Sequence, residues 1–481
     1  MIMETEVAIV GGGPAGLAAA VAAGEAGCRV TLIDAYARPG GQYYKRMPAE
    51  FGAHTPGALH HDFSVAEQLF ARLEGNPLIQ VLGNTSVWTA QVPAARGDAR
   101  AYSTTPLLSL DDGTRSYDLR AQAVVLAPGA YDRALPFPGW DLPGVLTVGA
   151  AQTLVKSQRV LPGRRVVLSG AGPFLLPVAA GLAEGGAEVV AVYEATWPPR
   201  WARHTPRVWN HWDKLGEARD YLRVLRRHGV PLRFGRAVVR AEGAGRVERV
   251  TVARLAADWT PRAGGEKHLE VDTLCIGYGF VPSTELSYLL GCAHRYDPVQ
   301  GTFIATHNGD MESSRPGVFV AGEITGIGGS AVALPQGALA GLAAARRLGR
   351  LDAGEAIARM APYRRTLRHQ HAFAGVLNRL FALQPGWMRW LTPDTVICRC
   401  EEVTYDQVQE AVREYHAHDA RTVKLVTRCG MGVCQGRVCG HSVTALTAAW
   451  SGRSPADVGM FTGRPIVKPV ALGDLAAGGE G

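Results

Sequence analysis

Apolar runs, glycine-rich turns and alanine-rich stretches follow one another in the same order in two parts of the chain. The first series starts at the apolar run 7–10 and ends at Asp34, and the second starts at 166–168 and ends at Glu194. Each series has the pattern of a buried strand, a tight turn, a helix and a second strand. Strands that alternate with helices predict parallel sheets, so we predict an α/β fold with two nucleotide-binding-type domains.

Three further apolar runs end in glycine turns and indicate how the chain is divided. The run 123–130 lies between the two series, whereas 271–279 and 317–323 follow the second. We therefore predict that the chain leaves the first domain and later returns to it. The predicted parts are residues 1–155 with 270–350 (first, dinucleotide-binding domain), 156–269 (second domain), 351–392 (helical connector), 393–455 (cysteine-containing domain) and 456–481 (tail, whose Gly/Ala-rich end is expected to be loose).

The turn of the first series has the residue types that a dinucleotide requires. Its first glycine permits a tight turn, its second lets the backbone approach a pyrophosphate, and its third lets the helix pack against the strand. The following helix presents unpaired N–H groups and a partial positive charge to an anion. An acid at the end of the next strand can accept hydrogen bonds from ribose hydroxyls. The predicted contact residues are Gly11, Gly13, Pro14, Ala15, Gly16 and Asp34.

The turn of the second series departs from this pattern because Leu175 stands where the third glycine would be. Helix and strand therefore cannot approach each other as closely there. Glu194 ends the following strand, where an acid favours a free ribose 2′-hydroxyl. Two interpretations stay open, a bound nucleotide (NAD or ATP-like) at Gly170, Gly172 and Glu194, or a turn without a ligand.

Composition and charge exclude several classes of protein. The 481 residues are 47% hydrophobic, which is enough to bury sizeable cores and excludes general disorder. The net charge of +7 is small for this length, and the basic region 200–227 is interpreted as a solvated helix, so no nucleic-acid partner is predicted. The apolar run 7–23 follows Glu4 and Glu6, and 324–345 contains Pro335 and five Gly. We therefore predict no signal peptide, no membrane span and a cytoplasmic location.

Five of the eight cysteines gather near the C-terminus, which indicates a local site in a reduced protein and not a disulfide framework. Cys398 and Cys400 are one residue apart, and Cys434 and Cys439 form a second pair 33 residues later. Four thiolates favour zinc or an iron–sulfur cluster, and zinc sites usually have longer spacings. Cys429 is a fifth thiol that could replace one of the four.

The remaining cysteines, Cys28, Cys275 and Cys292, are isolated among apolar neighbours and are predicted to be core thiols. A redox-active cysteine pair is therefore not expected in either dinucleotide domain. In the C-terminal region, Thr404 and Gln407 have the spacing of a capping box and predict a helix from there onward. Three arginines in that region would raise a cluster's reduction potential or simply solvate the surface; they are Arg399, Arg428 and Arg437.

Three short segments, residues 38–42 (RPGGQ), 127–130 (APGA) and 321–323 (AGE), resemble in this order the two-dinucleotide-binding flavoproteins with a glutathione-reductase-like fold. The resemblance implies FAD at the first turn and an NAD-type fold for the second domain. It implies that the late Gly–acid pair contacts the ribityl or phosphate region of the flavin. We expect Pro335 in the first turn of the next helix. The further FAD-binding residues that it implies are Gly41, Gln42, Ala127, Gly129, Gly322 and Glu323.

Two cysteine-containing strings, 398–404 (CRCEEVT) and 427–439 (TRCGMGVCQGRVC), resemble the small helical [2Fe-2S] domain of the bacterioferritin-associated-ferredoxin (BFD) type. The resemblance implies one [2Fe-2S] cluster in residues 393–455, with Cys429 dispensable. A zinc ion and unligated thiols are the alternatives. The implied cluster ligands are Cys398, Cys400, Cys434 and Cys439.

The combination of these parts, over about residues 4–450, resembles the α (A) subunits of heteromeric amino-acid and opine dehydrogenases of the D-hydroxyproline dehydrogenase, opine oxidase and hydrogen cyanide synthase type. The resemblance implies an FAD-dependent oxidoreductase subunit that transfers electrons and holds no substrate-oxidising catalytic residue. A flavin-containing β subunit resembling D-amino-acid or sarcosine oxidases would oxidise the C–N bond, and a small ferredoxin-like subunit is a further expected partner. Two alternatives are a self-sufficient NADH-dependent flavin reductase and a non-catalytic cluster carrier with a relic flavin fold.

Overall fold

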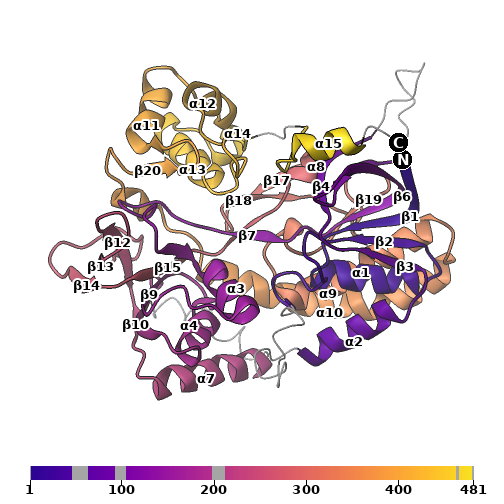
Figure 1. Cartoon of the computed structure of the whole chain (residues 1–481), viewed down its shortest axis with the longest axis horizontal. Coiled ribbons are helices and arrows are strands. Elements are labelled where there is room, and N and C mark those ends of the chain that lie inside the picture. Colours follow the sequence, from indigo (N-terminus) through magenta and orange to yellow (C-terminus); the bar gives the residue numbers. More distant parts are fainter. Residues whose placement is uncertain (1, 46–62, 93–104, 198–211, 462–464, 479–481) are drawn as a thin grey trace.

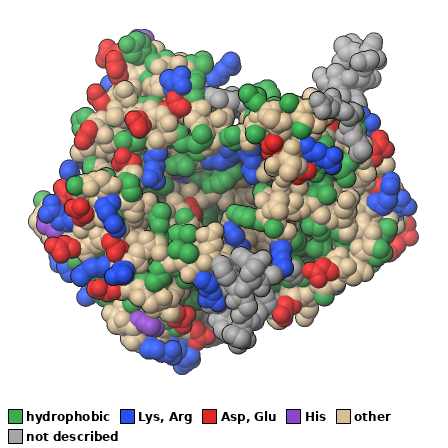
Figure 2. Space-filling model, viewed as in Figure 1, with side chains coloured by type: hydrophobic (Ala, Val, Ile, Leu, Met, Phe, Trp, Pro, Cys, Tyr) green, Lys and Arg blue, Asp and Glu red, His purple; other side chains and the backbone are tan. Residues whose placement is uncertain are grey.

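Two α/β domains and a small helical domain make up the computed structural model (Figure 1). It describes residues 2–45, 63–92, 105–197, 212–461 and 465–478. The face shown in Figure 2 is hollowed between these three parts, and Lys and Arg side chains lie along the hollow. This arrangement confirms the predicted fold class, an α/β flavoprotein-type body with a small, mainly helical C-terminal domain.

The first domain is built on a seven-stranded sheet in the order β3-β2-β1-β6-β5-β4, with β19 paired to β6. The first three of these strands, β6 and β19 are parallel, whereas β4, β5 and β6 form an antiparallel meander. Because β19 lies in this sheet, the chain returns to the first domain after the second is complete. The strands are β1 (Ile2–Val10), β2 (Val30–Ile33), β3 (Ile79–Leu82), β4 (Ser86–Gln91), β5 (Leu107–Asp111), β6 (Ser116–Leu126) and β19 (Val318–Val320).

Alanine-rich helices cover this sheet because small side chains allow close approach. Helix α1 (Pro14–Gly24) packs against α9 (Ser330–Arg347), and a Cβ on Gly337 or Gly341 would collide with the backbone of α1. Pro335 lies inside α9 and not in its first turn, so that expectation was wrong. The helix already begins at Ser330, with Gly329 as its N-cap, so Pro335 lies in its second turn. The other helices of this layer are α2 (Phe63–Glu74) and α10 (Ala353–Leu380), the latter lying within residues 351–392, which were predicted to be a helical connector.

The second domain has a five-stranded parallel sheet in the order β11-β10-β9-β15-β8 and an antiparallel three-stranded sheet beside it. Because β8 and β15 pair in this sheet, the second domain extends beyond the predicted bounds 156–269 at both ends. The basic region 200–227 lies partly outside the described residues, and its remainder belongs to α7. The parallel strands are β8 (Val145–Thr147), β9 (Arg165–Gly170), β10 (Glu188–Glu194), β11 (Leu232–Phe234) and β15 (Thr273–Gly277). The antiparallel strands are β12 (Arg236–Glu242), β13 (Arg249–Arg254) and β14 (Lys267–Glu270), and the helices are α3 (Val148–Gln158), α4 (Leu175–Glu184) and α7 (Trp212–Arg227).

The two domains are joined by a two-stranded antiparallel crossover sheet of β7 (Ala130–Asp132) and β16 (Phe280–Pro282). In Figure 1 this crossover lies between the two lobes and beneath the C-terminal domain. Short elements complete the return to the first domain, namely α8 (Glu285–Leu289), the hairpin β17 (His294–Asp297) and β18 (Thr302–Ala305), and the 3₁₀ helix η3 (Gly322–Thr325).

The C-terminal domain is a short hairpin followed by helices, and its first long helix carries the predicted capping box. The Thr404 side chain accepts from the Gln407 backbone N–H, and the Gln407 side chain accepts from the Thr404 backbone N–H at 2.9 Å. After the 3₁₀ helix η4 (Pro385–Trp390), the elements are β20 (Val396–Cys398), β21 (Val403–Thr404), α11 (Tyr405–Arg413), α12 (Ala420–Thr427), α13 (Gly440–Ser451) and α14 (Pro455–Val458).

The tail returns to the first domain. The Val467 backbone N–H donates to the Trp88 carbonyl oxygen at 2.8 Å, and α15 (Leu472–Gly478) follows. The backbone at Val467 is therefore fastened to the first domain, whereas the looseness expected for the Gly/Ala-rich end stays a prediction. Among the described residues, none of the helices combines the length and the apolar character that crossing a membrane requires.

Candidate flavin and cluster sites

The glycine-rich turn of the first domain has the shape of a pyrophosphate cradle. Gly11 has a φ of +100°, and a Cβ there would collide with the Ala127 carbonyl oxygen. A Cβ on Gly16 would collide with the carbonyl oxygen of Gly11, so both positions require glycine. Gly13 is the N-cap of α1 without a side-chain cap, and a Cβ there would meet only Gly41 Cα at 3.8 Å. The positive end of α1 therefore faces open space, where an anionic group fits.

Asp34 fixes this cradle from the end of β2. Its side chain is 5% exposed, and its Oδ2 and Oδ1 atoms accept from the backbone N–H groups of Gly12 at 2.7 Å and Tyr36 at 2.8 Å. Burial raises the pKa of Asp34, while the two backbone N–H donors and Lys468 lower it in part. The carboxylate thus holds the loop in shape, and its contact with a ribose stays a prediction.

The other predicted FAD residues meet the cradle at the same edge of the sheet. Gly41 has a φ of +59°, and a Cβ built on it would lie only 2.6 Å from Gly13 Cα, so glycine is required at residue 41. Gln42 donates to the Tyr36 hydroxyl at 2.7 Å. The Ala127 backbone N–H donates to the Val10 carbonyl oxygen, which ties the end of β6 to the end of β1. The structure therefore brings these segments together with the cradle.

Gly129 belongs to the same edge but differs from the other glycines. It has a φ of +80°, and a Cβ there would meet nothing within 4 Å. Its carbonyl oxygen accepts from the Ser283 backbone N–H, so the turn is held from the side of the crossover strand β16. The open space over Gly129 suits a cofactor that passes from the cradle towards the crossover sheet.

The Glu323 carboxylate binds the backbone of the loop before α9. Its two oxygens accept from the backbone N–H groups of Gly328 at 3.0 Å and Gly329 at 2.9 Å, and burial raises its pKa to about 7. Gly322 lies against Ala15, as the late segment of the predicted site should. The extra methylene of Glu thus directs the carboxylate to the loop backbone, which leaves no described contact towards the cradle.

Sequence reasoning missed Gln336, which is fully buried in α9. Its side-chain oxygen accepts from the Gly322 backbone N–H at 2.8 Å, and its amide donates to Thr325. This residue therefore anchors the late Gly–acid segment against the sheet. An uncharged polar residue inside an alanine-rich helical run was the available signal.

The second glycine-rich turn repeats the arrangement of the first. Glu194 is buried, and its carboxylate accepts from the backbone N–H groups of Gly172 at 2.9 Å and Thr196 at 2.8 Å, as Asp34 does in the first domain. Burial raises the pKa of Glu194 to about 7. A Cβ on Gly170 would collide with the Gly277 carbonyl oxygen, which explains that glycine by strand packing. The three predicted residues therefore lie together.

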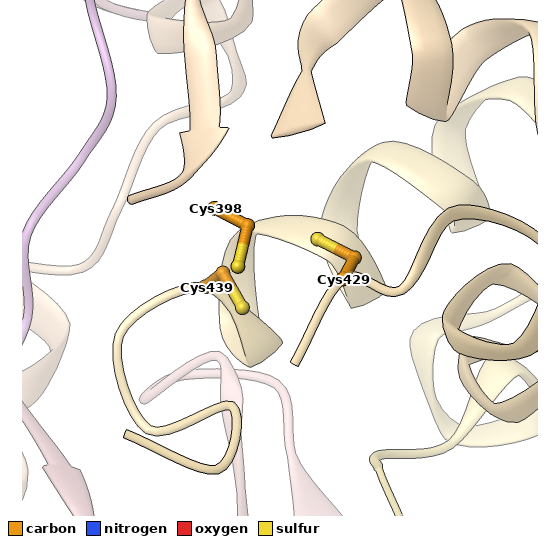
Figure 3. A group of neighbouring side chains, drawn as sticks. All are labelled: Cys398, Cys429 and Cys439. Atoms are coloured by element: carbon orange, nitrogen blue, oxygen red, sulfur yellow. The ribbon is translucent and has the colours of Figure 1, made fainter. Parts of the chain in front are cut away.

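Three buried thiols of the C-terminal domain point towards one another (Figure 3). The sulfur atoms of Cys398, Cys429 and Cys439 lie within 4.8 Å of one another. The predicted ligands Cys400 and Cys434 form a hydrogen-bonded pair, with Cys400 exposed and Cys434 partly exposed. All five thiols thus gather where two segments meet, but the third buried thiol is Cys429, which sequence reasoning set aside.

The electrostatics of this group favour a thiolate. Hydrogen bonds from the thiols of Cys429 and Cys439, together with backbone N–H groups of Gly430 and Glu401, lower the pKa of Cys398 to about 2. The pKa values of Cys429 and Cys439 are raised by the same contacts. Buried thiols beside backbone N–H donors suit an iron–sulfur cluster, since thiols lose their protons when they bind iron.

Of the three arginines near the cysteines, Arg437 connects the cluster domain to the flavin-type domain. Its Nε atom donates to the Tyr131 hydroxyl at 2.7 Å and lies 2.9 Å from the Glu285 carboxylate. Its other nitrogens donate to the Cys434 carbonyl oxygen at 3.2 Å and to the Val467 carbonyl oxygen at 2.6 Å. One guanidinium therefore contacts the cysteine loop (residues 428–439, between α12 and α13), the crossover sheet, α8 and the tail.

The other two arginines have different surroundings. Arg399 lies over the Trp140 ring, 5.1 Å from its centroid, and donates to the Asp141 carbonyl oxygen. The side chain of Arg428 is 70% exposed and pairs with Glu401 at 2.9 Å. Of the three, Arg437 alone has a largely buried side chain that contacts both the cysteine loop and the crossover sheet, so the positions that looked alike in the sequence are not equivalent.

Known protein families match both the two-domain α/β body and the C-terminal cysteine-containing domain. Residues 5–345 match the family model of the pyridine nucleotide-disulphide oxidoreductases, and residues 396–449 match the BFD-like [2Fe-2S] binding domain. The L-proline dehydrogenase of P. horikoshii has a similar solved structure, with a TM-score of 0.71 at 22% identity over 99% of this chain and 80% of that one. That likeness shows a shared fold.

Two curated relatives are similar over nearly the whole chain. Hydrogen cyanide synthase subunit HcnB of Pseudomonas protegens is 34% identical over 97% of both chains. The A subunit of opine oxidase from Rhizobium meliloti is 32% identical over 98% of this chain and 87% of its own. The chain therefore belongs to the pyridine nucleotide-disulphide oxidoreductase family, as a flavoprotein oxidoreductase subunit with a BFD-like [2Fe-2S] domain that is similar to HcnB and to its opine oxidase counterpart.

Proposed function

We propose that this chain is the FAD- and [2Fe-2S]-containing electron-transfer subunit of a heteromeric dehydrogenase. The complex would oxidise the C–N bond of an amino acid, imino acid or opine, in the hydroxyproline, proline and opine class. Substrate oxidation would take place on a flavin-containing β subunit, and a small ferredoxin-like subunit would be a further partner. The relatives support this proposal because their names describe subunits of a hydrogen cyanide synthase and of an opine oxidase.

One observation carries the proposal, namely that the cysteine loop is fastened to the flavin-type domain through Arg437. A bound flavin supplies two-electron chemistry, whereas a [2Fe-2S] cluster accepts electrons singly. The chain's own residues would hold the two groups: Gly11, Gly13 and the positive end of α1 orient a pyrophosphate, and Gly129 leaves room beside the crossover sheet. Arg437 keeps the cysteine loop against that sheet.

The predicted ligand set for the cluster remains Cys398, Cys400, Cys434 and Cys439. Support comes from the match of residues 396–449 to the BFD-like domain and from the meeting of both cysteine pairs at one place. The cytoplasmic location also remains a proposal. It is supported by the described cysteines, all of which are free thiols, as a reducing compartment would keep them.

The test compares the isolated chain with the co-purified complex under anaerobic conditions. Proline, hydroxyproline and an opine are added in turn, and the visible absorbance of the flavin and the cluster is recorded. We expect no substrate to bleach the isolated chain and one substrate to bleach the complex. Bleaching of the rigorously isolated chain would contradict the proposed division of labour.

An NADH-dependent flavin reductase is the second candidate, favoured by the contact between Glu194 and Gly172, which repeats the first cradle. Rapid bleaching of the isolated holoprotein by NADH would support it. The third candidate, a non-catalytic cluster carrier, predicts protein that contains iron and sulfide but no flavin after mild purification. A nucleotide (NAD or ATP-like) in the second domain would serve the second candidate as a reductant or any of the three as a structural group, and it would appear as nucleotide released on denaturation.

A further inference from the structure

A cavity of about 230 Å³ lies at the point where the second sheet reverses its strand order. In that sheet, β9 leads through β10 to β11 on one side, whereas β15 and β8 lie on the other. Ligands of open α/β sheets bind outside the carboxyl ends of the strands at such a point. Loops after β9 and β15 line the cavity with Gly172, Phe174, Gly279 and Phe280. The position is therefore that of a ligand site.

The helix α10 limits what this cavity can hold. Its C-terminal part and the residue after it line the cavity with Ala374, Leu377 and Phe381, and Asn378 donates to the Ile327 carbonyl oxygen at 2.8 Å. Sites for drug-sized ligands occupy about 300–1,000 Å³, and a nicotinamide dinucleotide is larger than most such ligands. The cavity is therefore sized for a compact molecule unless α10 moves away.

One cation in the wall has two nitrogens that the described part of the chain leaves unpaired. Arg133 follows β7, is 4% exposed, and lines the cavity. Its Nε and Nη2 atoms are buried and find no hydrogen-bond partner among the described residues. Burial lowers the pKa of Arg133 only to about 10, so the guanidinium keeps its charge at neutral pH.

The neighbours of this guanidinium do not neutralise it. No Asp or Glu is found among the described residues that line the cavity. Burial, together with the nearby Arg133 guanidinium, lowers the pKa of His441 of the C-terminal domain to about 3, and Tyr296 is a neutral phenol nearby. An unpaired buried charge is costly, so its retention points to an anion that is present when the protein works.

We propose that this cavity binds a compact carboxylate with an apolar or aromatic body, and that Arg133 receives the carboxylate. Two adjacent N–H groups of a guanidinium match the two oxygens of a carboxylate, which gives a bidentate pair. The phenyl rings of Phe174 and Phe280, whose centroids are 5.3 Å apart, provide the apolar wall. This binding site goes beyond the proposed electron-transfer function and does not depend on it.

The test uses benzoate as the probe and the flavin- and cluster-loaded protein, with calorimetric titration and thermal unfolding as readouts. The variants are Arg133→Met, Arg133→Lys and the control Arg246→Gln, which lies on an exposed turn. We expect the control to bind benzoate like the wild type, Arg133→Met to bind at least about tenfold more weakly, and Arg133→Lys to fall between them. Without benzoate, Arg133→Met should melt at or above the wild-type temperature, because an unpaired buried charge is removed.

Three results would overturn the proposal. Arg133→Met could bind benzoate as tightly as the wild type, or could melt several degrees lower, in which case Arg133 has a structural role. The wild type could fail to bind benzoate while binding inorganic phosphate in an Arg133-dependent way, which would make this a phosphate site. NADH could displace benzoate and bind more tightly, which would show that α10 opens and that the cavity takes a dinucleotide.

Discussion

At the scale of single residues, the flavin cradle depends on the absence of a side chain at Gly13. Its φ of −75° is accessible to any residue, and the nearest atom to a Cβ is 3.8 Å away. We predict that Gly13→Val folds but purifies with little or no flavin, because the side chain fills the space in front of α1. Absorbance of the bound flavin measures this, with Gly181→Val in α4, where a Cβ also has open space, as the control. A folded Gly13→Val protein with stoichiometric flavin would show that the cradle is elsewhere.

The five clustered cysteines are also compared at this scale, because four are predicted ligands and Cys429 is a predicted non-ligand neighbour. We predict that Cys434→Ser loses or destabilises the cluster, since an iron atom is left with an open site, whereas Cys429→Ser keeps it. Acid-labile sulfide, iron content and the EPR signal of the reduced protein report the outcome. The buried position of Cys429 beside Cys398 and Cys439 makes the comparison sharp. The opposite pattern, or zinc without sulfide in anaerobically prepared protein, would reject the predicted ligand set.

At the scale of elements, a capping box stabilises the N-terminus of α11. The capping box of Thr404 and Gln407 satisfies two backbone donors, and α11 buries Val408, Ala411 and Val412 below it. We predict that Thr404→Ala lowers the free energy of unfolding by about 1 kcal/mol. Glu410→Ala, on the exposed face of the same helix, should change it by less than about 0.5 kcal/mol. Equal effects of the two substitutions in denaturant titrations would mean that the cap is redundant.

At the scale of the whole molecule, the C-terminal domain is part of a larger core. One buried cluster includes Trp140 and Trp259 of the second domain together with Ile397 and Val408 of the C-terminal domain. The Trp140 indole N–H also donates to the Val396 carbonyl oxygen at 2.6 Å. The cluster domain is therefore held in place by apolar packing, and Arg437 adds a polar contact to the first domain.

We predict that Arg437→Gln keeps the cluster but loosens this attachment. The substitution leaves Glu285 without its cation and should lower the free energy of unfolding by about 1.5–3 kcal/mol. Photoreduced protein should then pass electrons from flavin to cluster more slowly in stopped-flow traces. Arg428→Gln, which removes an exposed ion pair, should cost at most about 1 kcal/mol and leave the rate unchanged. If both variants transfer electrons at the wild-type rate, Arg437 has no positioning role.

The sequence by itself determined the features that depend on neighbours along the chain. The strand–turn–helix units, the need for glycine at residues 11 and 16, and the capping box at Thr404 are local, because steric limits and backbone donors are decided within a few residues. The cysteine string and the order of the glycine turns identified the family for the same reason. The comparisons confirmed that identification.

Only the tertiary structure decided which distant groups meet. Arg437 contacts Tyr131 across 306 residues, and nothing in its surroundings along the chain separates it from Arg399 or Arg428. Cys429 lies among the buried thiols because of how the loop folds, and Glu323 turns to the backbone of its own loop. Two nitrogens of Arg133 are left unpaired among the described residues by the packing around them. Such outcomes depend on long-range packing and burial, which sequence spacing does not encode.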